Sequence, residues 1–146
     1  MAEPSTRTPE TIFVVEDSPL VLKLVVAILK EAGFVVLQAS SGNDAISLAA
    51  DYSGRIDLLL SDVKMPEMSG PDLGKSIKQS RPDIHVMLMS GFVGGDLLVL
   101  NYGWAFIDKP FVAKKLVEMV NAVLHAPDRS QGSRQYDTRA EVGKQE

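Results

Sequence analysis

Short apolar runs rich in β-branched residues alternate with longer amphipathic stretches over most of this chain. The runs predict five strands, at residues 12–15, 35–39, 57–61, 84–89 and 104–107. The stretches that follow them predict helices at 19–32, 43–52, 70–79, 95–100 and 112–124. Continuous apolar strands are typical of a parallel sheet that is covered on both faces. The alternation therefore predicts an α/β fold, with a doubly wound five-stranded parallel sheet, helices on both faces and right-handed crossovers.

The first predicted helix has clear signals at both of its ends. Ser18 and Pro19 suit an N-cap and a first helical position, and Gly33 is expected to end the helix. Apolar residues recur within it at helical spacing, which predicts one broad buried face. The residues of this face are Leu20, Val21, Leu24, Val25 and Ile28.

A single folded domain over residues 11–125 is expected, with flexible tails at 1–10 and 126–146, because both ends are polar and lack apolar periodicity. The second tail is too short and polar to form an output domain. The start of the chain has no signal peptide pattern. The longest apolar run, residues 20–29, is about half as long as a membrane span. We therefore expect a cytoplasmic protein without membrane attachment.

Charge and cysteine content exclude several classes of function. The formal net charge of −4 disfavours nucleic-acid binding, which depends on clustered Lys and Arg side chains. The chain has no cysteine, so disulfides, thiolate nucleophiles and thiolate metal sites are excluded.

Polar side chains follow four of the predicted strands. Glu16 and Asp17 come after the first strand, Asp62 after the third, Ser90 after the fourth and Lys109 after the fifth. Ligands of open parallel sheets bind beyond the carboxyl ends of the strands, near the point where the strand order reverses. We therefore expect these side chains to converge on one site.

Three carboxylates in one site require a cation, since two of them about 4 Å apart repel by about 4 kcal/mol at an intermediate dielectric. Oxygen ligands alone favour Mg²⁺, or Mn²⁺, over zinc. Mg²⁺ uses one or two carboxylates and leaves another free to react. Lys109 would add a second positive charge, and Ser90 a hydroxyl. Such a site suits phosphoryl transfer, which needs mainly positioning and charge neutralisation.

At these residues the chain resembles the receiver domain of two-component response regulators. The matching segments are VVEDS at 14–18, SDVKMPEMSG at 61–70, MSG at 89–91 and DKPF at 108–111. The resemblance covers about residues 11–125 and implies a flavodoxin-like sheet with strand order 2-1-3-4-5. The segment from 91 to 104 departs from the family pattern and looks more like stand-alone or hybrid-kinase receivers.

The resemblance implies that Asp62 is the phosphoacceptor, which takes a phosphoryl group from a sensor histidine kinase or a histidine phosphotransferase. It also implies metal ligation by Glu16, Asp17, Asp62 and the backbone carbonyl of Lys64. The resulting function is that of a phosphoprotein in a two-component system or phosphorelay, with Mg²⁺ as cofactor and no enzymatic turnover of its own. The downstream protein partner stays unknown.

The remaining family positions concern phosphate contacts and switching. The resemblance implies that Lys109 and Ser90 hold the phosphoryl group and that Ser90 and Phe106 form the conformational switch. The bond between Lys109 and Pro110 is expected to be cis, a form that X-Pro bonds tolerate at low cost.

Two alternatives stay open. A Mg²⁺-dependent phosphatase could also use an aspartyl phosphate on Asp62, but such enzymes normally have a second Asp two residues later, where this chain has Lys64, and they have a cap segment. A receiver-like binding module that is never phosphorylated is the other alternative. A flavin-binding protein is disfavoured because Glu16 and Asp17 would repel a flavin phosphate.

Overall fold

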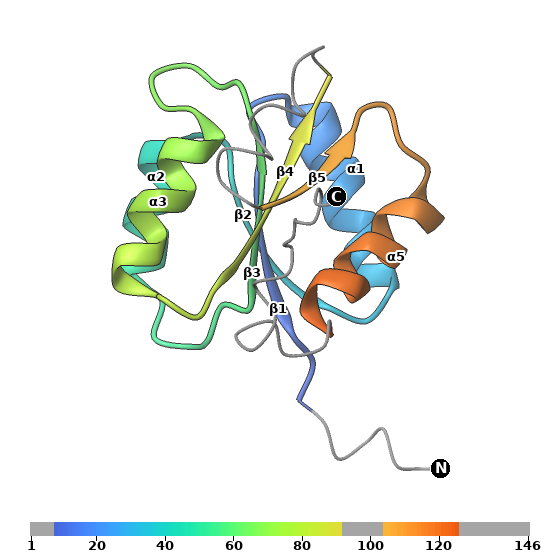
Figure 1. The fold of residues 1–146 in the computed structure, drawn as a ribbon, viewed down its shortest axis with the longest axis horizontal. Coiled ribbons are helices and arrows are strands. Elements are labelled where there is room, and N and C mark those ends of the chain that lie inside the picture. The colour runs from blue at the N-terminus through green and yellow to red at the C-terminus, as the bar shows by residue number, and fades with distance from the viewer. Residues whose placement is uncertain (1–7, 92–103, 126–146) are drawn as a thin grey trace, which may run out of the picture.

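The computed structural model describes residues 8–91 and 104–125 of the chain, which form a five-stranded sheet between two layers of helices (Figure 1). All strand pairings are parallel, and the order is β2-β1-β3-β4-β5. The strands are β1 (Thr11–Val15), β2 (Val35–Ala39), β3 (Leu58–Asp62), β4 (His85–Ser90) and β5 (Ala105–Asp108). The predicted fold class and the 2-1-3-4-5 strand order are confirmed.

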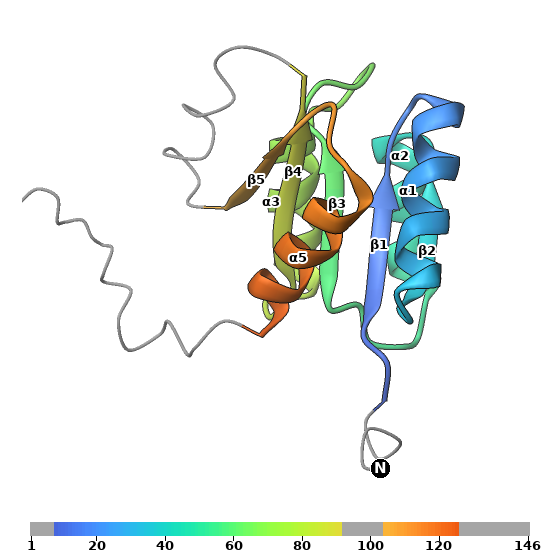
Figure 2. The same cartoon turned by 90° about the vertical axis from the view of Figure 1, so that its right-hand side faces the viewer.

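Helices cover both faces of the sheet, as predicted. They are α1 (Pro19–Glu31), α2 (Gly42–Asp51), α3 (Gly70–Ser80) and α5 (Ala113–Leu124). Helices α2 and α3 lie on one face, and α1 and α5 lie on the other (Figures 1 and 2). Each pair closes its own core: Phe13, Leu59 and Leu88 belong to the α2/α3 side, while alternate strand residues such as Val14 and Met87 belong to the α1/α5 side. The predicted helix at 95–100 lies outside the described residues.

Serine side chains begin three of the helices. The hydroxyl of Ser18 accepts a hydrogen bond from the backbone N–H of Val21, which confirms the predicted start of α1 at Pro19. The hydroxyls of Ser41 and Ser69 accept in the same way at the starts of α2 and α3. Such caps satisfy backbone donors that the first turn leaves unpaired, so they fix the residue at which each helix begins.

The predicted buried face of α1 is confirmed for Val21, Val25 and Ile28, which lie in or against the core, and is wrong for Leu20 and Leu24. The side chains that point into the core are Val25, Val26 and Leu29, whereas Leu20 is 78% exposed and Leu24 is 56% exposed. This helix is apolar around more than half of its circumference, so the spacing of apolar residues fits more than one face. Packing against the sheet and α5 selects the face, and two large leucines are left at the surface.

The strand register brings the predicted functional residues to one edge of the sheet. Val15 of β1 lies beside Ser61 of β3, and Asp62 lies beside Met89 of β4. Ser90 of β4 lies beside Asp108 of β5. The residues that follow these pairs therefore leave the sheet at the same end.

In the described ranges, none of the helices has both the length and the apolarity to cross a membrane.

Candidate functional site

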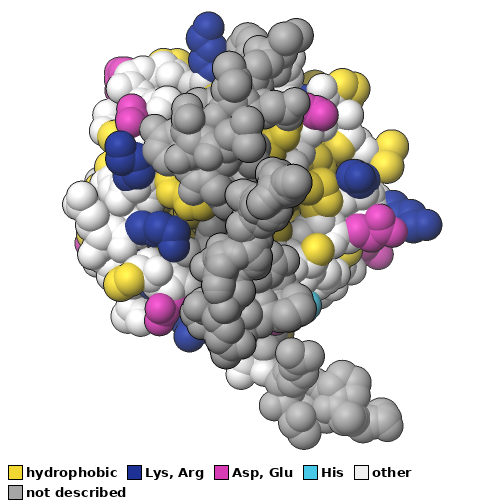
Figure 3. All heavy atoms as spheres, viewed as in Figure 1, with side chains coloured by type: hydrophobic (Ala, Val, Ile, Leu, Met, Phe, Trp, Pro, Cys, Tyr) yellow, Lys and Arg dark blue, Asp and Glu magenta, His cyan; other side chains and the backbone are white. Residues whose placement is uncertain are grey.

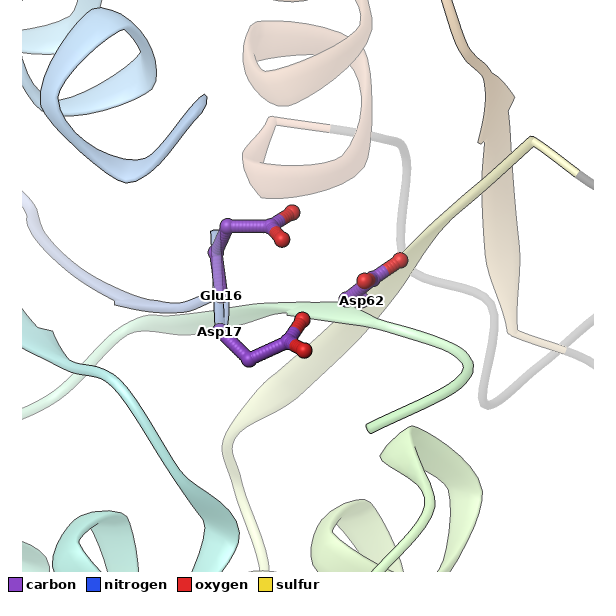
Figure 4. Close-up of side chains that lie close together, drawn as sticks. All are labelled: Glu16, Asp17 and Asp62. Carbon is purple, nitrogen blue, oxygen red and sulfur yellow. The ribbon is translucent and has the colours of Figure 1, made fainter. Parts of the chain in front are cut away.

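Three carboxylates meet at the carboxyl end of the sheet. Glu16 and Asp17 directly follow β1, and Asp62 is the last residue of β3. One oxygen from each carboxylate lies within 4.8 Å of the others. Figure 4 shows the three side chains directed toward a common space. The convergence predicted from the strand ends is confirmed for these residues.

The side chain of Glu16 is only 1% exposed, and two hydrogen bonds hold its carboxylate in place. Its Oε1 accepts a hydrogen bond from Lys109 Nζ at 2.8 Å, and its Oε2 accepts one from the backbone N–H of Ser18 at 3.0 Å. A buried carboxylate needs such partners, because leaving water without them is costly. Ser18 therefore serves both the cap of α1 and the site, and sequence reasoning recognised only the first role.

Lys109 joins the two buried carboxylates. Its Nζ lies 2.8 Å from Glu16 Oε1 and 3.2 Å from Asp62 Oδ1. Its backbone N–H donates to the carbonyl oxygen of Ser90 at 2.8 Å, so β4 positions the residue that follows β5. The bond between Lys109 and Pro110 is cis, as predicted. The predicted proximity of Lys109 to the carboxylates is thus confirmed by the geometry.

The pKa values of Asp62 and Lys109 reflect this crowding. Burial, followed by repulsion from Glu16, raises the pKa of Asp62 from its ordinary value of 3.8 to about 6, against the opposing charge of Lys109. Burial alone would lower the pKa of Lys109, but its hydrogen bond to Glu16 and the charge of Asp62 raise it above the ordinary value. The lysine therefore stays protonated, while the acidic cluster favours an additional positive charge.

The donor set fits a hard divalent cation. The three carboxylates carry three formal negative charges and Lys109 offsets one of them. Carboxylate oxygen ligands suit Mg²⁺ and Mn²⁺, whereas zinc sites usually contain Cys or His. The arrangement can therefore bind such an ion and keep Asp62 next to it.

The loop between β3 and α3 closes tightly against Asp62. The backbone N–H of Gly70 donates to the carbonyl oxygen of Val63 at 2.8 Å. A Cβ at position 70 would collide with the Asp62 carbonyl oxygen, so only glycine fits there. Lys64 is an exposed residue of this loop. Metal ligation by its backbone carbonyl stays a prediction.

Comparison with known proteins identifies the family that has this fold. A family model described as the response regulator receiver domain matches residues 12–121. The chain belongs to this family.

Similar receivers occur in proteins of two kinds. The sensor kinase CckA of Brucella abortus is 33% identical over 121 residues, which make up 81% of this chain and 13% of that protein. The polar-differentiation response regulator DivK of Brucella anthropi is 29% identical over 121 residues, or 80% of this chain and 97% of that protein. A solved receiver domain of the hybrid histidine kinase CckA is 35% identical, with a TM-score of 0.68, and the match covers 78% of this chain and 98% of that one. The chain therefore spans a small part of the kinase but nearly all of DivK.

The two proposed switch residues of this receiver lie on neighbouring strands. Ser90 ends β4 and is buried, and Phe106 of β5 is partly buried against the core on the α2/α3 side. Phe106 is the register partner of Leu88, which belongs to the same core. Because side chains alternate along a strand, Ser90 projects to the same face as Leu88. A switch that couples Ser90 to Phe106 stays a prediction.

Sequence reasoning assigned no role to Gly70 or to the hydroxyl of Ser61. Ser61 Oγ donates to the carbonyl oxygen of Asp62 at 2.9 Å, and the same oxygen is the one that a side chain at position 70 would strike. The signal available in the sequence was a glycine directly before Pro71 at a helix start. A glycine there is ambiguous without coordinates, since turns and close approaches both favour it.

Proposed function

We propose that this receiver accepts a phosphoryl group on Asp62 from a phosphohistidine of a sensor histidine kinase or histidine phosphotransferase, with Mg²⁺ as cofactor. The observation that carries the proposal is the cluster of Glu16, Asp17 and Asp62 with Lys109 in contact with two of them. Membership of the receiver family supports the same chemistry.

The transfer step needs one free carboxylate oxygen and a neutralised phosphoryl group. Within the described residues, Asp62 Oδ1 is the atom contacted by Lys109 and by the backbone N–H of Val63. We therefore assign the attack on phosphorus to Oδ2. A P–O bond forms, the P–N bond to the donor imidazole breaks, and the imidazole leaves with the bonding electron pair and takes up a proton.

Each residue of the site has a separate task in this proposal. Glu16, Asp17 and Asp62 would hold Mg²⁺ together with the carbonyl of Lys64. The bound ion would neutralise charge on the phosphoryl oxygens. Lys109 would contact another phosphoryl oxygen from its position beside Asp62.

The proposed output is a change of surface rather than turnover of a substrate. A phosphoryl group adds negative charge and strong hydrogen-bond acceptors at Asp62. The hydroxyl of Ser90 would move toward the phosphoryl group and donate a hydrogen bond to it. The space left by the Ser90 side chain would admit Phe106, which projects to the same face of the sheet. Binding of a protein partner to one of the two conformations would then transmit the signal.

The surface near the site suits a protein partner. Leu20, Leu24 and Val112 are large exposed apolar residues, and they lie on α1 and on the segment just after Lys109. In the described part of the face in Figure 3, Lys and Arg side chains are separated by acidic and apolar ones. This mixture supports protein docking, and the described residues of this one face form no continuous basic patch.

Phosphorylation by a small donor tests the proposal directly. The protein is incubated with Mg²⁺ and acetyl phosphate or phosphoramidate and then weighed intact. We expect the mass of one phosphoryl group to be added, and we expect no gain after Asp62→Asn substitution or in excess EDTA. A wild-type protein that gains no mass with either donor, although it binds Mg²⁺, would refute the phosphoacceptor role.

A phosphate-release assay distinguishes a signalling receiver from an enzyme that turns over phosphomonoesters. Sustained release of phosphate from several phosphomonoesters would favour the phosphatase alternative. Stoichiometric labelling followed by slow hydrolysis would favour the receiver. Transfer from a panel of phosphorylated histidine kinases and phosphotransferases would then identify the partner by its rate.

A further inference from the structure

We propose that Asn43, at the start of α2, positions the metal-binding loop of this receiver by holding the side chain of Glu67. The loop, residues 63–69, connects β3 to α3 and contains Lys64. This inference deepens the proposed function and rests on it, because it concerns the loop whose carbonyl group would contact the metal ion.

The outer end of the loop has an unusual backbone. Glu67 has φ of 72°, and within the described residues it is the only one other than glycine with positive φ. The N–H of Met68 donates to the carbonyl oxygen of Pro66 at 2.8 Å, which closes a three-residue turn around Glu67. Such a γ-turn with positive φ is rare and strained. A turn of this kind persists only where surrounding contacts hold it.

Two adjacent residues of α2 supply such contacts. Asn43 Nδ2 donates to Glu67 Oε1 at 3.0 Å, across 24 residues of sequence. Next to it, Gly42 packs directly against Met68, so that a Cβ at position 42 would lie 2.8 Å from Met68 Sδ. The tip of the loop is therefore fixed to the start of α2 by one hydrogen bond and one close packing contact.

The base of the loop is fixed separately. Gly70 bonds back to the carbonyl oxygen of Val63, and the N–H of Val63 donates to Asp62 Oδ1 and to the carbonyl oxygen of Met89. Lys64 lies between this rigid base and the tip. We therefore infer that movement of the tip would displace its carbonyl group, and that the side chain of Asn43 limits this movement.

The competing interpretation is an exposed hydrogen bond with no functional effect, since polar contacts at the surface often contribute little. The two interpretations differ in what the contact changes. A positioning contact should alter metal affinity and the order of the loop, whereas an incidental one should alter neither.

The test compares variants by Mg²⁺ titration calorimetry and, in EDTA, by amide hydrogen exchange of Lys64, Met65, Glu67 and Met68. Asn43→Ala should weaken Mg²⁺ binding by about 2- to 10-fold, as the loss of one net hydrogen bond implies. It should also speed exchange in the loop before any metal is added. Ser47→Ala, one turn along the exposed side of α2, is the matched control and should change neither quantity.

Further substitutions at Asn43 and Glu67 distinguish the effect of their hydrogen bond from the effect of the charge on Glu67. Glu67→Gln removes the charge but keeps an acceptor oxygen, so loop exchange should stay as in the wild type. Asn43→Asp places two carboxylates in contact and should loosen the loop further. Adding Glu67→Gln to Asn43→Asp supplies an amide donor to the new carboxylate and should restore slow exchange and most of the metal affinity.

A glycine at position 67 separates positioning from fold stability. Glu67→Gly relieves the positive φ and removes the hydrogen bond, so resistance to urea should rise while Mg²⁺ affinity falls. If Asn43→Ala and Asn43→Asp leave both Mg²⁺ affinity and loop exchange within error of the wild type, the inference is overturned. Failure of the wild type to take a phosphoryl group, with loop exchange still dependent on Asn43, would instead refute the proposed function alone.

Discussion

Replacing Asp62 by asparagine should stabilise this receiver in the absence of metal. Burial and the nearby Glu16 raise the pKa of Asp62 from 3.8 to about 6, so the folded state disfavours the ionised carboxylate. At about 1.4 kcal/mol per pKa unit, this shift of about two units corresponds to about 3 kcal/mol. Lys109 loses one of its two carboxylate partners in the variant, which offsets part of the gain. We therefore expect a net stabilisation of about 1–3 kcal/mol at neutral pH.

The stability gained by Asp62→Asn should increase as the pH rises. Because the pKa of Asp62 is higher in the folded state, the folded protein binds the proton more tightly than the unfolded chain does. The wild type therefore loses stability as the pH rises from about 4 to about 6, and the penalty is complete above that range. The advantage of Asp62→Asn should be small below about pH 4 and should reach its full size above about pH 7.

Urea unfolding of both proteins in EDTA, at a series of pH values, measures this difference. Other titrating groups contribute to both proteins, so the subtraction isolates position 62. Asp83→Asn, at an exposed turn position, controls for the loss of a carboxylate elsewhere. A variant that is less stable than the wild type at neutral pH, or a gain that is equally large in acid, would refute the reasoning. Mg²⁺ should stabilise the wild type strongly and the variant much less.

Four further substitutions test other parts of the structure. Lys109→Met should slow phosphorylation by acetyl phosphate and destabilise the metal-free protein by about 1–3 kcal/mol in urea, and an unchanged rate would contradict its assigned role. Gly70→Ala should cost more than about 2 kcal/mol, because its methyl group meets the Asp62 carbonyl oxygen; a cost near zero would contradict the close approach. Arg81→Ala removes donors to three carbonyl groups at the end of α2 and should cost about 2–3 kcal/mol by thermal unfolding, with Arg81→Lys recovering part of it. Leu24→Ala should change stability by less than about 0.5 kcal/mol and leave acetyl phosphate labelling intact, but should slow transfer from a phosphohistidine protein.

The sequence allowed the sheet and the convergence at its edge to be predicted, because both depend on local patterns. Parallel strands place their carboxyl ends at one edge, so Glu16, Asp62 and Lys109 could be assigned to one site before any contact was known. Boundaries shifted by one residue in several elements: β3 was expected at 57–61 and is Leu58–Asp62. Asp62 is therefore the last residue of β3, and its pairing with Met89 of β4 fixes its backbone.

The details that adjust the site depend on contacts between distant residues. Nothing in the local pattern around Asn43 indicates that its amide reaches Glu67, and an Asn in a first helical turn is common. The buried position of Glu16 was also hidden, because an acidic residue after a strand is normally solvated. Both features follow from how separate elements pack, which hydrophobic periodicity does not encode.

The two residues of α1 that were wrongly predicted to be buried bear on the proposed function. A helix that is apolar over most of its circumference satisfies the core with Val25, Val26 and Leu29, and Leu20 and Leu24 are then left exposed. Core packing therefore does not account for those two leucines, and exposed apolar area is expected where a partner binds. Leu20 is the third residue after Asp17, so a partner bound to this face would lie beside the carboxylate cluster. Under the proposed function, Leu20 and Leu24 would supply apolar area on α1 for a phosphohistidine protein that docks next to Asp62.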